Sequence, residues 1–487
     1  MTPQVILIAF LLYTTLLFVV SWFTARKADN ESFFIGNRKS PWFVVAYGMI
    51  GASLSGVTFI SVPGWVGTTH FTYFVIVLGY VAGYAVISLI LLPMYYRLNL
   101  TSIYTYLGQR FGKSTYKTGS SFFLISRIIG ASFRMYLVVS ILQIFVFDHF
   151  GIPFWLTVAI FLILIQLYTM KGGIKTIVWT DTLQTTFMLL SVVITVGIIV
   201  HDMNISWSDM WQKVWSSDYS KIFVSNIKSK QNFIKLFFSG MFITIAMTGL
   251  DQDMMQKNLS CRNLKDARKN MTTLSLILVP VNFIFLFLGA VLFFYAGHIH
   301  LDVSGLTDHV FPEIALHHLG IAGGMIFFVG LISAAYSSAD SALTALTTSL
   351  SIDIMELDRK CAGDEKLLRK KRQNVHFLMM LIIIFVILLF KSINNQAIIA
   401  QLFTFAGYTY GPLLGLYAFG LFTKYSVRDK WVPVIALLSP VLAYGLSRWL
   451  EYVFTGYKTG FEILILNGLI TFIGLIFIIV NKKSYKL

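Results

Sequence analysis

The chain has 487 residues, of which 56% are hydrophobic and only 12% are charged, and its mean hydropathy is +0.74. Charged residues make up about a quarter of an ordinary globular protein, so this composition excludes a soluble fold. The net charge of +16 does not indicate a nucleic-acid partner, because the Lys and Arg residues lie mostly in loops between apolar runs. The two cysteines, Cys261 and Cys361, supply neither a disulfide framework nor a metal cluster.

Apolar runs long enough to cross a bilayer follow one another along the whole chain. The first run, from Val5 to Val20, has no basic flank and no small-residue cleavage site, so we expect a retained helix rather than a signal peptide. A span needs roughly 20 apolar residues, and on this basis about thirteen spans are predicted. They lie near 4–24, 43–67, 72–95, 118–147, 153–170, 178–200, 232–255, 272–297, 320–350, 375–391, 397–422, 431–452 and 461–480.

Basic residues gather in alternate loops, such as 257–269 and the tail with Lys482, Lys483 and Lys486, whereas 298–318 has no Lys or Arg. The positive-inside rule then predicts a multi-pass protein of the cytoplasmic (inner) membrane, with its N-terminus outside and its C-terminus in the cytoplasm. Loop 202–231 is the exception, because it is predicted to lie outside and yet carries several Lys residues. Trp207, Trp211 and Trp215 follow one another there at four-residue spacing, which predicts an amphipathic helix at the outer interface.

Two spans contain features that break helices. Glycines, hydroxyl residues and Pro63 occupy the middle of the second span, over 47–64, and polar residues follow Gly249 near the end of the seventh. Any one of these residues could serve close helix packing, but their density favours an unwound segment. Irregular backbone is tolerated in lipid only where it lines an enclosed cavity. Broken helices five spans apart are typical of transporters built from inverted repeats.

The ninth span is rich in hydroxyl side chains. A sodium ion prefers several neutral oxygen ligands. Ala334 and Ser338 are four residues apart, as are Ser337 and Ser341, so a carbonyl and hydroxyls share one helix face. The same hydroxyls could equally bond back to their own helix. Asp340 in this span is costly unless it is paired or bound to an ion.

With these features the chain resembles the sodium/solute symporter family, which has the LeuT-type inverted-repeat fold. The resemblance covers nearly the whole chain, and its most specific pieces are 32–38, 172–173 with 179–181, 337–338 with 353–354, and 411–415 with Gly420. It implies an all-α polytopic membrane protein of 5+5 helices with one extra N-terminal and two extra C-terminal helices. The single transporter domain, 1–487, would then comprise 4–24, a first repeat over 43–200, a second over 232–422, and the last helices over 431–480.

The resemblance also implies ion sites. Members of the family join two carbonyls of the broken first core helix to a carbonyl and two hydroxyls of core helix eight. The matching sodium ligands here are Gly51, Leu54, Ala334, Ser337 and Ser338. Some members bind a second sodium one turn further along, where this chain has Asp340 and Ser341, together with the family acidic position Asp181. Asp340 departs from the family pattern and fits a sodium ligand, a proton site or a salt-bridge partner, and Asp181 fits a helix cap or a structural ion pair as well.

The substrate cavity is expected between the first, third and sixth core helices. Its predicted lining residues are Ser53, Ser55, Thr58 and Thr244. Members that resemble sialic-acid carriers hold a carboxylate with an arginine on the third core helix. Here the aligned position is Gly130, and Arg134 lies one turn away. Arg134 either binds an anion or neutralises Asp340 or Asp181, and the internal ion pair is the preferred interpretation.

The predicted function is Na⁺-coupled symport of a small organic solute into the cytoplasm by alternating access, with Na⁺ as the required ion. The solute is a sugar, a polyol or a sialic-acid-like carboxylate. The expected partners are this solute and the lipid bilayer, with no nucleic acid, a monomer as the functional unit, and no enzymatic activity. The alternatives are a transporter-like sensor or receptor, a proton-coupled carrier, and a channel, whose uptake would not require a gradient of a second ion.

Overall fold

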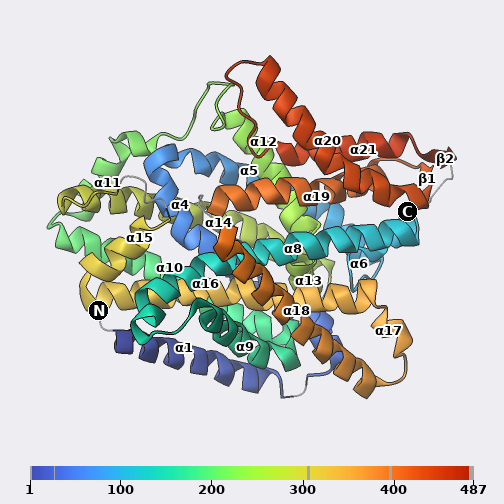
Figure 1. The fold of residues 1–487 in the computed structure, drawn as a ribbon, viewed down its shortest axis with the longest axis horizontal. Coiled ribbons are helices and arrows are strands. Elements are labelled where there is room, and N and C mark those ends of the chain that lie inside the picture. The colour runs from blue at the N-terminus through green and yellow to red at the C-terminus, as the bar shows by residue number, and fades with distance from the viewer. Residues whose placement is uncertain (1–2, 27, 304–307, 394–397, 482–487) are drawn as a thin grey trace.

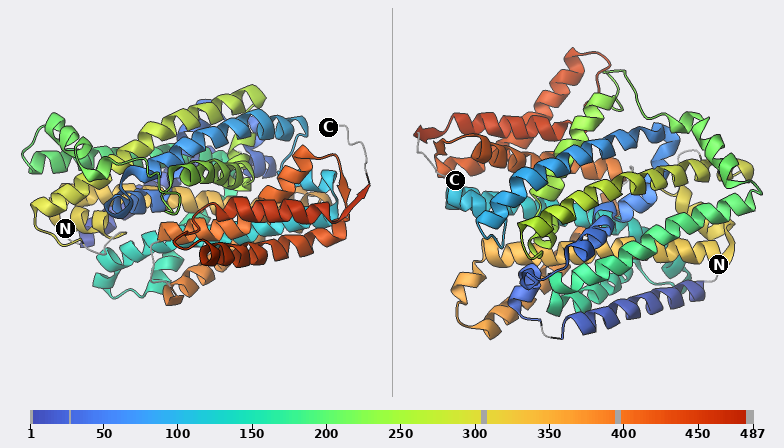
Figure 2. Two further views of the ribbon diagram at one scale, coloured as in Figure 1. Left: turned by 90° about the horizontal axis from the view of Figure 1, so that it is seen from above. Right: turned by 180° about the vertical axis from the view of Figure 1, so that it is seen from behind.

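Long helices run side by side along the longest dimension of the molecule (Figure 1). The computed structural model describes residues 3–481 apart from 27, 304–307 and 394–397. The tail lysines named above, Lys482, Lys483 and Lys486, therefore lie outside the described residues. The start of α1 and the strand β2 lie at opposite ends of this long dimension, and Figure 2 shows the same separation from two further sides.

Helices dominate because a helix satisfies its own backbone polar groups, which lipid cannot do. The N-terminal half contains α1 (Pro3–Thr24), α2 (Asn30–Ile35), α3 (Trp42–Leu54), α4 (Gly56–Thr69), α5 (Tyr73–Val86), α6 (Leu92–Arg97), α7 (Thr105–Arg110), α8 (Lys113–Leu142), α9 (Phe154–Gly172), α10 (Ile174–Asp202) and α11 (Trp207–Trp215). The C-terminal half contains α12 (Phe233–Thr244), α13 (Gln252–Leu259), α14 (Leu264–His298), α15 (Val310–Glu313), α16 (Gly320–Ser349), α17 (Leu357–Lys360), α18 (Glu365–Ile393), α19 (Ile398–Phe422), α20 (Val432–Val453) and α21 (Ile463–Ile476). Two short strands, β1 (Ser426–Val427) and β2 (Ile479–Asn481), pair antiparallel.

Nine helices of the described chain are long and apolar enough to cross a membrane, and a bent pair brings the number up to ten. Two shorter apolar helices, α3 and α21, add to this set. The prediction of an all-helical, multi-pass membrane protein is therefore confirmed. The number of about thirteen spans and the division into two repeats stay predictions.

The first predicted helix break lies at Ser55, between α3 and α4. Ser55 has φ 29° and ψ 168°, which no α-helix tolerates, and its backbone N–H donates to the Gly51 carbonyl at 3.1 Å. The last carbonyls of a helix lack intrahelical partners, so the end of α3 offers backbone oxygens to a binding site. Pro63 does not contribute to the break as expected, because it lies inside α4.

The second predicted break separates α12 from α13. After α12 the chain makes one turn of π-helix, Ile245–Gly249, and the pair of helices is then bent by 64°. Asp251 begins the new helix as its N-cap, since its Oδ1 accepts from the backbone N–H groups of Asp253 and Met254 at 2.9 and 3.3 Å. The polar residues after Gly249 thus cap a helix that starts in the interior of the protein.

Helix α10 supports both the first break and α16, since it packs against α3, α14 and α16. Small residues allow the close approach of α3, as is common between membrane helices. A Cβ on Gly51 would collide with the Thr185 hydroxyl, which accepts from the Gly51 N–H at 3.1 Å. The end of α3 is therefore held at a fixed place beside α16.

The predicted amphipathic helix is present as α11. Ser206 caps it by accepting from the Asp209 N–H at 3.1 Å. Met210 and Val214 are buried, whereas Trp207, Trp211 and Trp215 are between 49% and 57% exposed. This arrangement leaves a tryptophan face of the kind that lies at a membrane interface.

Candidate functional site

All five residues that were predicted to bind substrate line one cavity beside the first helix break. The cavity has a volume of about 90 Å³. Ser53, Ser55 and Thr58 reach it from the α3–α4 region, Thr244 from α12, and Arg134 from α8. Three segments that are far apart in sequence therefore meet around one space. Substrate binding by these residues stays a prediction.

Other lining residues were not anticipated from the sequence. Tyr80 and Tyr84 of α5, Thr248 after α12 and Asn282 of α14 complete the polar wall. The Tyr80 hydroxyl lies 3.2 Å from that of Tyr73, which also lines the cavity. Tyrosines combine an apolar ring with a polar tip, so in the sequence they are indistinguishable from ordinary residues of a span.

Arg134 faces this cavity and does not form the internal ion pair that we expected. Its Nε is buried without a hydrogen-bond partner. No carboxylate among the described residues forms an ion pair with its guanidinium, and the two candidates, Asp340 and Asp181, are engaged elsewhere. A guanidinium inside a membrane protein is expensive to leave unpaired. Arg134 is therefore free to bind an anion that enters the cavity.

A second arginine, Arg127, lies two turns below Arg134 on the same helix and was missed. It is 5% exposed and forms ion pairs with Asp253 and, at 3.8 Å, with Asp251. The Tyr410 hydroxyl donates to Asp251 Oδ2 at 2.5 Å. The seven-residue spacing places both arginines on one face of α8, which is the signal that could have revealed this pair. Arg127 is neutralised by carboxylates at the second helix break, whereas Arg134 is not.

The residues assigned to the first sodium site lie where α3 ends beside α16. Ser338 Oγ donates to the Ala334 carbonyl at 3.1 Å, and Ser337 Oγ donates to Asp181 Oδ1 at 2.7 Å. Both hydroxyls keep lone pairs that can accept a cation. All five predicted ligands, Gly51, Leu54, Ala334, Ser337 and Ser338, are buried. An all-oxygen set with neutral side chains fits a hard monovalent cation.

Asp181 belongs to a buried ion pair. Its Oδ2 lies 2.7 Å from Lys257 Nζ, and both side chains are 1% exposed. Lys257 comes from α13, directly beyond the second helix break. The pair therefore joins α10 to the broken helix, and Ser337 adds α16 to the same contact. The structural ion pair left open for Asp181 is present, with a partner that the sequence analysis did not identify.

Asp340 is fully buried and has no cationic partner among the described side chains. Its Oδ2 accepts from the Tyr168 hydroxyl at 2.7 Å and from Gln184 Nε2 at 3.4 Å. Nearby oxygens of Gln184, Ser341 and Thr344 are buried without hydrogen-bond partners. Unsatisfied buried oxygens around a carboxylate are the donor set of a cation site. The salt bridge left open for Asp340 is not formed among the described residues, and the sodium ligand and the proton site both stay predictions.

The family follows from a comparison of the whole sequence. The family model described as the sodium:solute symporter family matches residues 33–427. The chain belongs to the sodium:solute symporter family. The chain is therefore a Na⁺-coupled transporter of the membrane and not an enzyme.

Relatives and solved structures agree with this assignment. The chain is 23% identical to the sodium/sialic acid symporter NanT of Aliivibrio fischeri over 90% of this chain and 89% of that protein. It is also 23% identical to the sodium-coupled monocarboxylate transporter 1 of Mus musculus, over 87% and 68% of the two chains. A substrate-bound, outward-open Na⁺-coupled sialic acid symporter has the same fold, with a TM-score of 0.82 at 19% identity over 96% of each chain.

Proposed function

We propose that this symporter imports a small organic anion and that Arg134 binds its carboxylate. The observation behind the proposal is the unpaired guanidinium in the central cavity, surrounded by hydroxyl groups at the two helix breaks. A guanidinium binds a carboxylate with two parallel hydrogen bonds. The relatives support the same class of solute, since sialic acid and monocarboxylates both carry one carboxylate.

The hydroxyls around Arg134 would recognise the rest of the solute. Ser53, Ser55, Thr58 and Thr244 are grouped with Asn282 on the walls of the cavity. Donors and acceptors at such positions discriminate strongly against an analogue that lacks a matching group. We therefore favour a hydroxylated carboxylate over a plain fatty acid.

The first Na⁺ would bind at Gly51, Leu54, Ala334, Ser337 and Ser338. Such an ion joins the carbonyl end of α3 to α16 and so fixes the break at Ser55, which also lines the solute cavity. Na⁺ binding would then order one wall of the solute site. This shared segment couples the ion to the solute, because each ligand favours the same conformation of the broken helix.

A second Na⁺ would bind at Asp340 and Ser341, near the pair that Asp181 forms with Lys257. The charged residues of the two groups beside the broken helix fit this stoichiometry; Arg110, Asp353 and Arg372 are also buried but belong to neither group. The charges of Asp251 and Asp253 sum to zero with those of Arg127 and Arg134. In the other group, Asp181 and Asp340 carry one more negative charge than Lys257 neutralises. Two Na⁺ ions and one monovalent anion bring the total to zero, and uncompensated buried charge is strongly unfavourable.

Energetics also favour two ions for an anionic solute. Each charge that crosses 100 mV contributes about 2.3 kcal/mol, and each tenfold Na⁺ gradient contributes about 1.4 kcal/mol. One Na⁺ with one monovalent anion moves no net charge and sustains only about a tenfold solute gradient. Two Na⁺ ions supply about 5 kcal/mol, which sustains a gradient of several thousandfold.

Release to the cytoplasm would require the second broken helix to move. In the present structure the contacts of Arg127 with Asp251 and Asp253, and of Lys257 with Asp181, tie α13 to α8 and α10. Alternating access would break and reform these contacts while the central cavity changes sides. The topology predicted from loop charge places the N-terminus and α11 outside.

Uptake into proteoliposomes tests the proposal. Labelled lactate, sialic acid, glucose and iodide are offered with an inward Na⁺ gradient or without one. We expect Na⁺-dependent uptake of a carboxylate, its loss in R134Q, and loss of Na⁺ dependence in S338A. Uptake of glucose but of neither carboxylate would refute an anionic solute, and uptake of iodide alone would refute a carboxylate.

A further inference from the structure

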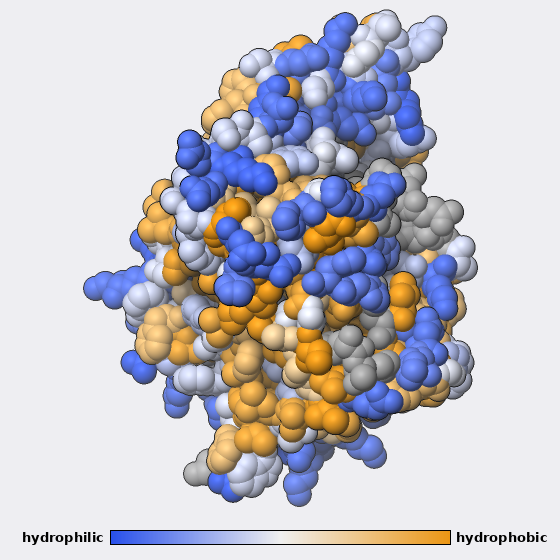
Figure 3. All heavy atoms as spheres, turned by 90° about the vertical axis from the view of Figure 1, so that its left-hand side faces the viewer, coloured by the Kyte–Doolittle hydropathy of each residue, from blue (hydrophilic) through white to orange (hydrophobic). Residues whose placement is uncertain are grey.

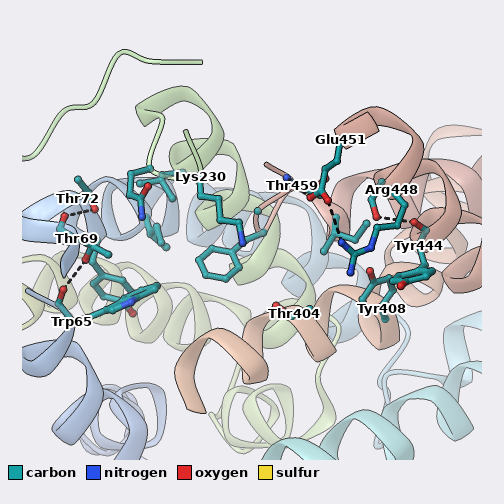
Figure 4. Close-up of a pocket in the computed structure, with 18 residues that line it drawn as sticks. Trp65, Thr69, Thr72, Lys230, Thr404, Tyr408, Tyr444, Arg448, Glu451 and Thr459 are labelled. Atoms are coloured by element: carbon teal, nitrogen blue, oxygen red, sulfur yellow. Dashed lines mark hydrogen bonds and ion pairs between the residues drawn. The ribbon is translucent and has the colours of Figure 1, made fainter. Parts of the chain in front are cut away.

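A second and larger cavity lies beside the central one and has no role in the scheme above. Its volume is about 270 Å³. It is formed where α4, α5, α19 and α20 meet the segments before α12 and α21, and Figure 4 shows its lining side chains. Its lining includes Trp65, Tyr73, Lys230, Thr404, Tyr408 and Arg448.

The larger cavity adjoins the central cavity. Tyr73 lines both, and the neighbours Phe403 and Thr404 divide between them, with Phe403 at the central cavity and Thr404 at the larger one. The two cavities therefore share a wall, at Tyr73 and at the Phe403–Thr404 step. We call the larger cavity the vestibule.

The lining of the vestibule carries a small excess of positive charge. Lys230 and Arg448 line it directly, with Glu451 as the acidic residue of the lining. Arg448 lies over the ring of Tyr444 at 5.3 Å and pairs with Glu451 at 3.3 Å, so its guanidinium is held in place. Among the described side chains, no carboxylate forms an ion pair with Lys230, which is exposed.

Two further lysines, Lys228 and Lys458, belong to loops next to the vestibule but do not line it. Lys228 Nζ donates to the Thr455 carbonyl at 2.9 Å, and the Lys458 N–H donates to the Lys228 carbonyl at 3.3 Å. The loops before α12 and before α21 therefore touch. Figure 3 looks onto the end of the molecule with α11, and hydrophilic side chains gather over its upper part.

This charge contradicts the rule that otherwise describes the sequence. Loops predicted to lie outside, such as 148–153 and 298–318, contain no Lys or Arg. The two outer loops that do contain Lys, 202–231 and 453–460, are the ones that meet at the vestibule. Topology disfavours positive residues on the outer side, so their concentration beside the vestibule calls for a local function.

We propose that the vestibule is an outer capture site for organic anions, which loads the central cavity. It takes the same carboxylate class as Arg134, and in this respect the inference rests on the proposed function. The cations attract the anion from solution, and a cleft that focuses positive potential raises its local concentration by about tenfold or more. The aromatic rings of Trp65, Tyr408 and Tyr444 offer flat apolar surface to the rest of the solute.

Thiol modification tests this inference without a known solute. Thr404 is replaced by Cys in full-length protein in which Cys261 and Cys361 are Ser. Reaction rates are measured with an anionic and a cationic methanethiosulfonate reagent. The ratio of the anionic to the cationic reaction rate is compared with the same ratio for a free thiol in solution. We expect it to be about tenfold higher at the introduced thiol. K230Q together with R448Q should remove this preference, whereas K221Q, an exposed lysine outside the vestibule, should keep it.

Two results would overturn the capture site. One is equal reactivity toward both reagents in the parent protein, and the other is an unchanged preference in the double variant. A salt series on the parent protein needs no variant, and the preference should fall steeply toward 1 M salt as the charges are screened. A preference that ignores salt contradicts the inference. Because no transport is measured, a failure here is distinct from a failure of carboxylate uptake.

Discussion

Two groups of buried charges flank the broken helix formed by α3 and α4, and they differ in what they lack. On one side Arg127 is paired with Asp251 and Asp253, and Arg134 projects into an open cavity. On the other side Asp181 is paired with Lys257. Asp340 accepts hydrogen bonds there but forms no ion pair with a basic side chain of the described residues.

Under the proposed function, a ligand of opposite sign binds on each side. In the arginine group, Arg127 has acidic partners and Arg134 has none among the described residues. Arg134 lines the central cavity, from which an anion could reach it. In the aspartate group, Asp181 is paired with Lys257, whereas Asp340 has no basic partner among the described residues. Asp340 is fully buried, with oxygens of neighbouring side chains nearby. A small hard cation fits the second environment and a carboxylate fits the first.

Removal of Lys257 should have the largest effect. K257Q leaves the Asp181 carboxylate buried without a cation, which destabilises a protein by about 3–5 kcal/mol. The melting temperature in detergent should fall clearly below those of K257R and of the exposed-site control K221Q. Equal melting temperatures for K257Q and K221Q would mean that the pair is not a structural element.

D340N should have the next largest effect, on coupling rather than on folding. Loss of one Na⁺ per cycle should reduce carboxylate accumulation at 100 mV from several thousandfold to about tenfold. The Hill coefficient for Na⁺ should fall toward one. The matched control is D209N on the exposed helix α11. Unchanged accumulation in D340N would remove Asp340 from the ion pathway.

R134Q should weaken carboxylate transport by about a hundredfold or more, because two charge-assisted hydrogen bonds are lost. Stabilisation of the folded protein by Na⁺, measured by thermal unfolding without solute, should persist since the ion sites lie on α3 and α16. R134K keeps the charge without the bidentate geometry and should be intermediate. Full uptake in R134Q would place the carboxylate elsewhere.

T244V should have the smallest effect. The loss of one hydroxyl from the cavity wall removes one neutral hydrogen bond, about 1 kcal/mol, and should raise KM about fivefold with little change in kcat. Thr195 supplies the control, because its hydroxyl donates to the Ser191 carbonyl of its own helix away from the cavity. If T244V and T195V have the same KM, Thr244 does not contact the solute.

Hydropathy and loop charge predicted the helices well, because membrane spans follow from local composition. Both helix breaks were also visible locally, as glycines and polar residues inside apolar runs. At the first break, the expected contribution of Pro63 to the unwound segment was wrong. A helix accommodates proline when its freed backbone groups find other partners. The cavity residues on α3, α4 and α12 could be located because the breaks themselves line the cavity.

Charge partners could not be predicted in the same way. Asp181 and Lys257 are separated along the chain by most of α10, all of α11 and α12, and part of α13. Nothing local distinguishes Lys257 from a basic residue at the edge of a span. Arg134 was assigned to an internal ion pair because Asp340 and Asp181 needed partners. The structure supplies Lys257 for one, and Tyr168 with Gln184 for the other. Pairing of this kind depends on tertiary packing.

The ratio of ion flux to solute flux tests the central claim most directly. Uptake of ²²Na⁺ and of a labelled carboxylate is measured in the same proteoliposomes, and the membrane potential at which net flux reverses is recorded. We expect two Na⁺ for each carboxylate, with one positive charge moved per cycle and a reversal potential that shifts accordingly. An electroneutral one-to-one ratio, or carboxylate flux that is independent of Na⁺, would contradict it.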